Sequence, residues 1–218
     1  MRISIFGLGY VGAVTGACLA SHGHTVVGVD INQQKVEDFS SGHPSIIEPG
    51  MEILLATAKE KGLLKGTQDC CEAIRESEVS IVCVGTPSSA SGALDLSYVR
   101  QVSEELASAI RKKGTKHYLI LRSTMLPGST EKLIEVYFKD LLESALLEVY
   151  YFPEFLREGT AIKDFEKPAL VVVGTSDGLP PSPEMEPIFG LQVEVVKWCT
   201  AELIKYGCNA FHALKIAF

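Results

Sequence analysis

The stretch "RISIFGLGYVGAVTGACLASHG", residues 2–23, decides the fold of this chain. Residues 2–6 form a short run of β-favouring side chains, and residues 10–23 place small side chains at helical spacing before a final glycine. Between the two runs lies the pattern G-x-G-x-x-G, formed by Gly7, Gly9 and Gly12. The pattern is a weak signal alone, but a strand that passes through it into a helix is typical of dinucleotide-binding α/β units.

Each glycine of this pattern has its own structural task. Gly7 allows the tight turn after the strand, Gly9 lets the backbone approach a pyrophosphate, and Gly12 lets the helix pack closely on the strand. The backbone N–H groups of Tyr10 and Val11 would then face the phosphates at the start of the helix. The sequence therefore predicts a phosphate-binding turn at these residues.

An acidic residue closes the next predicted strand, residues 25–30. Asp30 follows the glycines at about the 20-residue spacing that this fold uses, and a carboxylate there accepts hydrogen bonds from both hydroxyls of the adenosine ribose. The same charge repels a 2′-phosphate, so we expect NAD rather than NADP as the cofactor. Lys35 lies a turn into the following helix and could also reach the ribose. The alternative interpretation is a glycine-rich turn with a solvated aspartate.

Strand-like and helix-like segments alternate along the rest of the chain. Continuous apolar strands of this kind indicate a parallel sheet with helices on both faces. The predicted strands are residues 2–6, 25–30, 79–87, 116–124, 146–155, 169–174 and 192–197. The predicted helices are residues 10–23, 32–42, 48–62, 96–114 and 127–144, and a last one from about residue 200. A polar loop is predicted at residues 88–95, and the Pro-rich stretch at residues 178–187 is interpreted as a surface excursion.

These elements predict one fold class and two parts. We expect an α/β, Rossmann-like, doubly wound and mostly parallel sheet that forms an NAD-binding domain over residues 1–198. Residues 199–218 would form the start of a long central helix that is cut short.

The composition narrows the possible partners. The 218 residues are 46% hydrophobic and 22% charged, and their net charge of −7 argues against nucleic acid or an anionic membrane as a partner. No apolar run reaches the roughly 20 residues that a bilayer span needs. Glycines interrupt the apolar start, so we do not interpret it as a secretion signal and expect a cytoplasmic protein. The six cysteines form no C-x-x-C pair and have no histidines at ligand spacing, so we expect no metal site and mostly buried thiols.

The last stretch, "ELIKYGCNAFHALKIAF" at residues 202–218, is predicted to be a mostly buried helix. Lys205, Asn209 and His212 stand at i, i+4 and i+7, and Glu202 extends this polar stripe. A single polar residue on an apolar helix is more often a satisfied core group or a snorkelling tail than a ligand. Several on one face predict a lined pocket.

Five motifs in order resemble one enzyme family. They are "MRISIFGLGYVGAV" (1–14), "VCVGTP" (82–87), "LRSTMLPGST" (121–130), "PEFLREGTAIKDF" (153–165) and "ELIKYGCNAFHALKIAF" (202–218). Together they are similar to the UDP-glucose/GDP-mannose dehydrogenase family, the nucleotide-sugar 6-dehydrogenases. Within that family the motifs look most like the GDP-mannose branch.

The resemblance implies a double oxidation that uses NAD. A primary alcohol at C6 of a nucleotide sugar, GDP-mannose in preference to UDP-glucose, becomes an aldehyde, which a cysteine traps. A second hydride transfer and hydrolysis then release the uronic acid. Family members are longer and form homodimers through the long helix, and their catalytic cysteine lies beyond the position of Phe218. We therefore expect an N-terminal fragment that binds NAD but does not complete the reaction.

The resemblance also implies roles for four residues between the strands and helices. Thr86 would border the cofactor, and Thr124 would lie beside the nicotinamide and hold a water, with capping of the next helix as a second interpretation. Glu154 would be the base of the hydrolytic step and Glu158 a sugar contact. If that segment is helical, their spacing places both carboxylates on one face.

The polar stripe of the last helix receives roles in the same way. Lys205 and Asn209 would act at the reacting carbon, where the ammonium stabilises an oxyanion or, when neutral, takes the alcohol proton. His212 would contact the sugar nucleotide. One position departs from the family pattern, because Phe152 stands where an asparagine is usual, which leaves open whether the local hydrogen bonds survive.

Two other functions stay open at this stage. A one-step β-hydroxyacid dehydrogenase also carries a lysine and an asparagine four residues apart, but a glycine-rich run usually precedes that lysine, and "WCTAELIK" has none. A non-catalytic dinucleotide-binding module is the other alternative, although it has no need for Glu154, Glu158, Lys205 and Asn209.

Overall fold

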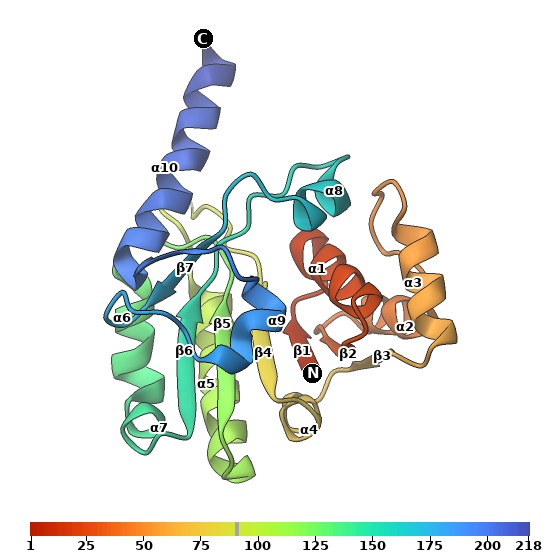
Figure 1. The fold of residues 1–218 in the computed structure, drawn as a ribbon, viewed down its shortest axis with the longest axis horizontal. Helices are drawn as coiled ribbons and strands as arrows, with labels where there is room; N and C mark the ends of the chain where they lie inside the picture. Colours follow the sequence, from red (N-terminus) through yellow and green to blue (C-terminus); the bar gives the residue numbers. More distant parts are fainter. Residues whose placement is uncertain (90–91) are drawn as a thin grey trace.

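The computed structural model describes residues 1–89 and 92–218, which form one sheet with helices on both faces (Figure 1). The strands are β1 (Arg2–Phe6), β2 (Thr25–Val29), β3 (Leu64–Thr67), β4 (Val79–Val82), β5 (His117–Leu121), β6 (Leu147–Tyr151), β7 (Val172–Thr175) and β8 (Glu194–Lys197). The helices are α1 (Tyr10–Ser21), α2 (Gln33–Ser41), α3 (Met51–Glu60), α4 (Cys70–Glu76), α5 (Ser97–Lys113), α6 (Ser129–Leu133), α7 (Lys139–Glu143), α8 (Ala161–Glu166), α9 (Glu186–Phe189) and α10 (Trp198–Ala217).

The strand order is β3-β2-β1-β4-β5-β6-β7-β8 within the described ranges. Neighbouring strands are parallel except β6 and β7, which meet antiparallel at Tyr151 and Gly174. This order is that of the doubly wound dinucleotide-binding sheet, and it reverses between β1 and β4. The predicted fold class, a Rossmann-like and mostly parallel α/β sheet that ends in a long helix, is therefore confirmed.

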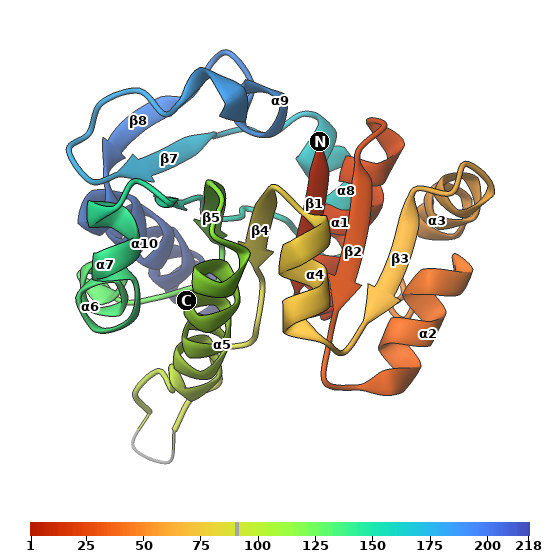
Figure 2. The same cartoon turned by 90° about the horizontal axis from the view of Figure 1, so that it is seen from below.

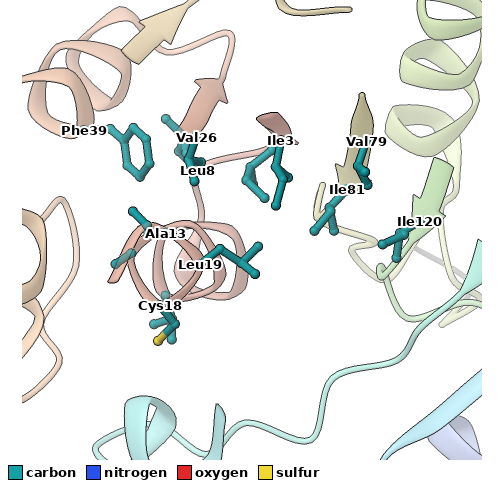
Figure 3. Packing of buried hydrophobic residues seen from close by; sticks show 14 of the residues in the cluster. Ile3, Leu8, Ala13, Cys18, Leu19, Val26, Phe39, Val79, Ile81 and Ile120 are labelled. Atoms are coloured by element: carbon teal, nitrogen blue, oxygen red, sulfur yellow. The ribbon is translucent and has the colours of Figure 1, made fainter. Parts of the chain in front are cut away.

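Both faces of the sheet are buried, which explains the continuous apolar strands. In β1, Ile3 and Ile5 belong to one apolar cluster while Phe6 belongs to the cluster on the other face. The first cluster packs beneath α1, α2 and α3, as Figure 3 shows for Ile3, Val26 and Phe39 around α1. The second packs beneath α4, α5 and the start of α10, and Figure 2 shows α4 and α5 side by side on that face.

Two elements in residues 63–78 were absent from the sequence-based prediction. The four-residue strand β3 pairs only with β2, at the edge of the sheet, and its Lys65 makes ion pairs with Glu72 and Glu76. So short and polar a strand has no apolar alternation to predict it. The helix α4 did carry a signal, because the Asp69 side chain caps it by accepting from the N–H groups of Cys71 and Glu72.

Three predicted segments differ from the structure in detail. The helix predicted at residues 127–144 is α6 and α7 joined by a π-helical stretch, Ile134–Phe138. The predicted surface excursion at 178–187 is mostly exposed, but it buries Met185 in the first apolar cluster, within a 3-10 turn that leads into α9. The polar loop predicted at 88–95 includes residues 90 and 91, which lie outside the described residues.

A buried polar network crosses β1, β4 and β5. Ser4 Oγ shares hydrogen bonds with the hydroxyls of Ser77 (3.0 Å) and Ser80 (2.7 Å), and Ser80 Oγ lies 2.8 Å from His117 Nε2. Lys113 Nζ donates to His117 Nδ1 (3.0 Å) and to the Ser77 carbonyl (2.6 Å). Burial, aided by the Lys113 charge, lowers the pKa of His117 to about 3.

This network predicts a loss of stability in mild acid. An imidazole with its ordinary pKa of 6.5 takes a proton in the unfolded chain below that pH, whereas His117 stays neutral in the native state down to about pH 3. Stability from this group is therefore complete above pH 6.5 and falls as the pH drops. We expect a loss of about 2 kcal/mol between pH 7 and pH 5. Urea unfolding at the two pH values measures it.

The control variant is His117→Asn, whose amide oxygen can still accept from Lys113 but does not titrate. The difference in unfolding free energy between the two pH values should shrink by about 2 kcal/mol in this variant. An unchanged difference would show that His117 does not carry the pH dependence.

Candidate active site

The turn between β1 and α1 has the geometry that a diphosphate requires. Gly7 has a φ of +95°, and its N–H donates to the Val29 carbonyl at 2.8 Å. A Cβ on Gly12 would lie 1.8 Å from the Gly7 carbonyl oxygen, so helix and turn touch there. A Cβ on Gly9 would meet no atom of the described residues within 4 Å, which leaves the space above Gly9 open.

The start of α1 offers unpaired backbone donors. Among the described residues no side chain caps α1 at Gly9, and its first turn carries no acidic residue. The N–H groups of Tyr10 and Val11 are therefore free to bind an anion at the positive end of the helix. Open space over Gly9 and free donors beside it fit the diphosphate of a dinucleotide.

Asp30 is built into the same turn rather than solvated. Its Oδ2 accepts from the Leu8 N–H (2.7 Å), its Oδ1 accepts from the Asn32 N–H (2.9 Å), and its side chain is 10% exposed. Lys35 Nζ lies 4.0 Å from Oδ2. A carboxylate has about four acceptor sites, so two remain for the hydroxyls of a ribose.

Loops from neighbouring strands lie together at the carboxyl-terminal end of the parallel strands, where the dinucleotide turn also lies. Thr86 follows β4 and Thr124 follows β5, and both threonines are half-buried. The Ser123 hydroxyl joins the two loops by donating to the Val84 carbonyl at 2.7 Å. Because β1, β2, β4, β5 and β6 are parallel, Asp30, both threonines and Glu154 come from carboxyl ends at the same edge.

Lys205 and Glu154, which are far apart in sequence, form a buried ion pair. Lys205 Nζ donates to the Glu154 carbonyl oxygen (2.6 Å) and to its Oε1 (2.7 Å), and the two side chains are 5% and 13% exposed. Glu154 Oε2 accepts from the Leu156 N–H at 2.7 Å. The first turns of α10 thus hold the segment that follows β6.

Glu202 has a different place from the predicted one. Its Oε2 accepts from the Gly128 N–H (2.6 Å), and its Oε1 accepts from the N–H and the hydroxyl of Thr130 (both 2.7 Å). Burial raises the pKa of Glu202, and these hydrogen bonds oppose the rise. The prediction that Glu202 lines a pocket is wrong, because it caps α6 from α10. Thr124 does not cap α6, whose N-cap position is Gly128.

Three other predicted site residues, Glu158, Asn209 and His212, do not lie with Lys205 and Glu154. The segment after β6 is not helical, so Glu154 and Glu158 do not share a helical face, and Glu158 is exposed. Asn209 and His212 are also exposed, because α10 leaves the body of the molecule after Lys205 (Figure 1). The prediction of a mostly buried last helix is therefore wrong for its second half.

Phe152 is accommodated by apolar and cation–π contacts. Its ring lies 4.7 Å from the Arg122 guanidinium and 5.0 Å from the Phe189 ring. Its carbonyl accepts from Arg122 Nη1 at 3.3 Å, so the backbone at this position keeps a hydrogen bond. Arg122 is buried, its Nε has no hydrogen-bond partner among the described residues, and burial lowers the pKa of its guanidinium.

The cysteines are free thiols, and only Cys18 is fully buried, so the prediction that most are buried is wrong. Burial raises the pKa of Cys18, Cys70 and Cys83 to about 12. No group of three His, Cys, Asp or Glu side chains in the described ranges could hold a metal ion. No helix in those ranges is both long and apolar enough to cross a bilayer.

The site missed by the sequence analysis lies beside Tyr10. The carboxylate of Glu48, in the loop before α3, is buried there against the hydroxyl of Tyr10 and the backbone of Gly159 and Ala161. The sequence analysis placed Glu48 only at the start of the helix predicted at residues 48–62. Its backbone partners Gly159 and Ala161 lie more than a hundred residues away.

Comparison with known proteins now identifies the family. The model of the UDP-glucose/GDP-mannose dehydrogenase family NAD-binding domain matches residues 1–185. The chain belongs to this family. The cofactor of the domain is therefore NAD, as Asp30 and the glycine turn predicted.

Relatives in the family match over the whole chain. The sequence is 43% identical to GDP-mannose 6-dehydrogenase of Pseudomonas aeruginosa and 37% identical to UDP-glucose 6-dehydrogenase of Rhizobium meliloti. The crystal structure of a ternary complex of GDP-mannose dehydrogenase from Pseudomonas aeruginosa superposes with a TM-score of 0.88 at 42% identity, over 99% of this chain. In each case the match covers 51% of the other protein, so the chain spans about half the length of the relatives it matches.

Proposed function

We propose that these residues are the cofactor-binding half of a nucleotide-sugar 6-dehydrogenase that oxidises the C6 alcohol of GDP-mannose to the carboxylate of GDP-mannuronate. The observation that carries this proposal is the buried pair of Lys205 and Glu154, at the same end of the parallel strands as the dinucleotide turn. When bound, NAD supplies the hydride acceptor for the oxidation. The protein side chains then have to position the sugar and move its protons.

The residues of the chain divide this work between them. The ammonium of Lys205 is buried from solvent and stabilises oxyanion charge at the reacting carbon. Asn209, one turn later on α10, assists it. Glu154, fixed by Lys205, is the base for the hydrolytic step, and Thr124 holds the water. We assign contacts with the sugar nucleotide to Glu158 and His212.

A buried ion pair speaks against the non-catalytic alternative. Replacing such a pair by apolar side chains is often neutral or stabilising, so stability alone is a weak reason to keep it. UDP-glucose remains the second candidate substrate, supported by the relative at 37% identity, against 43% for the GDP-mannose enzyme.

The division of the chain and its partners belong to the same proposal. We assign residues 1–198 to the NAD-binding domain and residues 199–218 to a helix shared with the rest of the enzyme. The exposed apolar side chains of this helix, among them Leu203, Phe211 and Ile216, would pair in a homodimer. The raised pKa values of Cys18, Cys70 and Cys83 do not suit a nucleophilic thiolate, so we assign the nucleophile to none of these three cysteines.

Asp30→Ala tests the cofactor site. Loss of a hydrogen bond to a charged group costs about 1.5–3 kcal/mol, so NAD affinity measured by calorimetry should fall about tenfold or more. The preference for NAD over NADP should narrow at the same time, because the charge that repels a 2′-phosphate is gone. The control is Glu37→Gln, which removes an exposed carboxylate from α2 and should leave both values unchanged.

The substrate is tested by adding GDP-mannose, UDP-glucose or NAD separately and following thermal unfolding. In a version of the protein with the length of its relatives, GDP-mannose should give NADH faster than UDP-glucose. Faster NADH formation with UDP-glucose would instead assign UDP-glucose as the substrate. Separately, an unchanged NAD affinity in Asp30→Ala would show that Asp30 does not bind the ribose.

A further inference from the structure

A buried carboxylate joins the cofactor turn to the segment that carries Glu154. Glu48 is 7% exposed, and no ion pair joins it to a lysine, arginine or histidine within the described part of the chain. Its Oε2 accepts from the Gly159 N–H (2.8 Å), and its Oε1 accepts from the Ala161 N–H (2.8 Å). The hydroxyl of Tyr10 donates to the same Oε2.

Tyr10 brings this carboxylate next to the phosphate-binding backbone. It is the first residue of α1 and directly follows Gly9. Its hydroxyl also accepts from the Gly159 N–H at 3.2 Å, so one phenol touches both Glu48 and the distant segment. Burial, and then the hydrogen bond to Glu48, raise the pKa of Tyr10 to about 12, which keeps the hydroxyl protonated as a donor.

Two side chains from distant parts of the chain bond to the segment from residue 152 to residue 161, one near each end. At one end Lys205 bonds to the carbonyl and the carboxylate of Glu154, and at the other end Glu48 bonds to Gly159 and Ala161. Between these points the segment has no helix or strand, and it crosses from β6 towards α8 and α1 (Figure 1). The second attachment therefore helps to set the place of Glu154.

A cap for α8 alone does not require this arrangement. Helix N-caps are commonly neutral serine, threonine or asparagine side chains at the N-cap position, whereas a buried carboxylate without a cation carries a desolvation cost. Burial by itself raises the pKa of Glu48, but the hydrogen bonds from Tyr10 and from the backbone of Gly159 and Ala161 outweigh it and lower the pKa. The charge is thus stabilised by a partner that stands in the cofactor turn.

We propose that Tyr10 and Glu48 are positioning residues that couple NAD binding to the placement of residues 152–161. A diphosphate bound over Gly9 fixes the first turn of α1, and this restricts Tyr10, the Glu48 carboxylate and the Gly159 and Ala161 amides in turn. This coupling is reciprocal. If bound NAD favours the ordered segment by a given factor, ordering of the segment around a substrate raises the affinity for NAD by that same factor. This inference rests on the proposed NAD site.

Hydrogen exchange at the backbone amides of residues 154–162, with and without saturating NAD, tests the coupling. In the 218-residue protein, NAD should slow exchange there about fivefold or more. Tyr10→Phe removes only the hydroxyl and leaves the backbone donors of the turn in place. It should keep the fold, lose most of this slowing, and weaken the NAD affinity measured by calorimetry by no more than the same factor. Glu48→Gln should do the same, and Tyr98→Phe, in an exposed tyrosine of α5, should behave as the unmodified protein.

The outcomes separate the two proposals. If calorimetry shows NAD binding but the segment exchanges equally with and without it, or if Tyr10→Phe keeps the full slowing, the coupling is refuted and the NAD site stands. If calorimetry shows no NAD binding by the unmodified protein, the proposed function fails and the coupling fails with it.

Discussion

Gly9→Ala should lose NAD binding without losing stability. An added Cβ at Gly9 meets no described atom within 4 Å, and the φ of −73° at this residue suits alanine. The methyl group would instead occupy the space that a diphosphate needs. Losing charge-assisted hydrogen bonds to two phosphate oxygens costs about 3 kcal/mol or more, so calorimetry should show NAD affinity reduced about a hundredfold or more.

Gly12→Ala should differ from Gly9→Ala by destabilising the protein itself. Its Cβ would lie 1.8 Å from the Gly7 carbonyl oxygen, and neither backbone can move without opening the contact between α1 and β1. We expect urea unfolding to show a loss of about 3 kcal/mol, at the upper end of overpacking effects, together with lost NAD binding. A stable Gly12→Ala protein that binds NAD would contradict our account of the turn.

The control for both variants is Gly207→Ala. Gly207 lies in α10 with no described atom within 4 Å of an added Cβ. Alanine favours a helix over glycine by about 1 kcal/mol, so this variant should be slightly more stable and bind NAD normally.

Lys205→Met should strongly destabilise the protein. It leaves the Glu154 carboxylate, 13% exposed, without its cation, and breaking a buried pair from one side costs about 3–5 kcal/mol. Urea unfolding at neutral pH measures the loss. In a version of the protein with the length of its relatives, turnover should fall far more than NAD affinity.

The double variant Lys205→Met with Glu154→Leu should recover most of the lost stability, because no buried charge is then left alone. Lys139→Met is the control, since its ion pair with Glu135 has a similar N–O distance, 2.8 Å against 2.7 Å, but lies on the surface with side chains 56% and 67% exposed. That variant should leave the free energy of unfolding nearly unchanged, because solvent screens an exposed pair. An equal loss in Lys139→Met and Lys205→Met would show that burial of the pair has no special effect.

Much of the fold follows from local pattern. Residues 2–23 contain a strand, a glycine turn and a helix in one continuous signal, and the structure has β1 and α1 there. Strands buried on both faces stand out as apolar runs, whereas the polar edge strand β3 does not, because only one neighbour and few apolar side chains support it.

The site was less predictable because its contacts are non-local. The cofactor turn and Asp30 lie within one βαβ unit, so spacing alone indicated them. The resemblance gave Lys205 and Glu154 separate roles but did not predict their ion pair, and no local pattern indicated that Glu48 would meet Gly159. Asn209 and His212 are exposed because α10 extends away from the sheet before it reaches them. The spacing of apolar residues along the helix does not predict where that happens.

The cap that α10 places on α6 has a mechanical consequence. Glu202 is hydrogen-bonded to the chain after β5 and Lys205 to the segment after β6, and both side chains come from one turn of α10. A tilt of the protruding half of α10 would move the hydrogen bonds of Glu202 and Lys205 together rather than one at a time. The Thr124 loop and the Glu154 segment therefore share one support, and their separation is fixed by the spacing of Glu202 and Lys205 on α10.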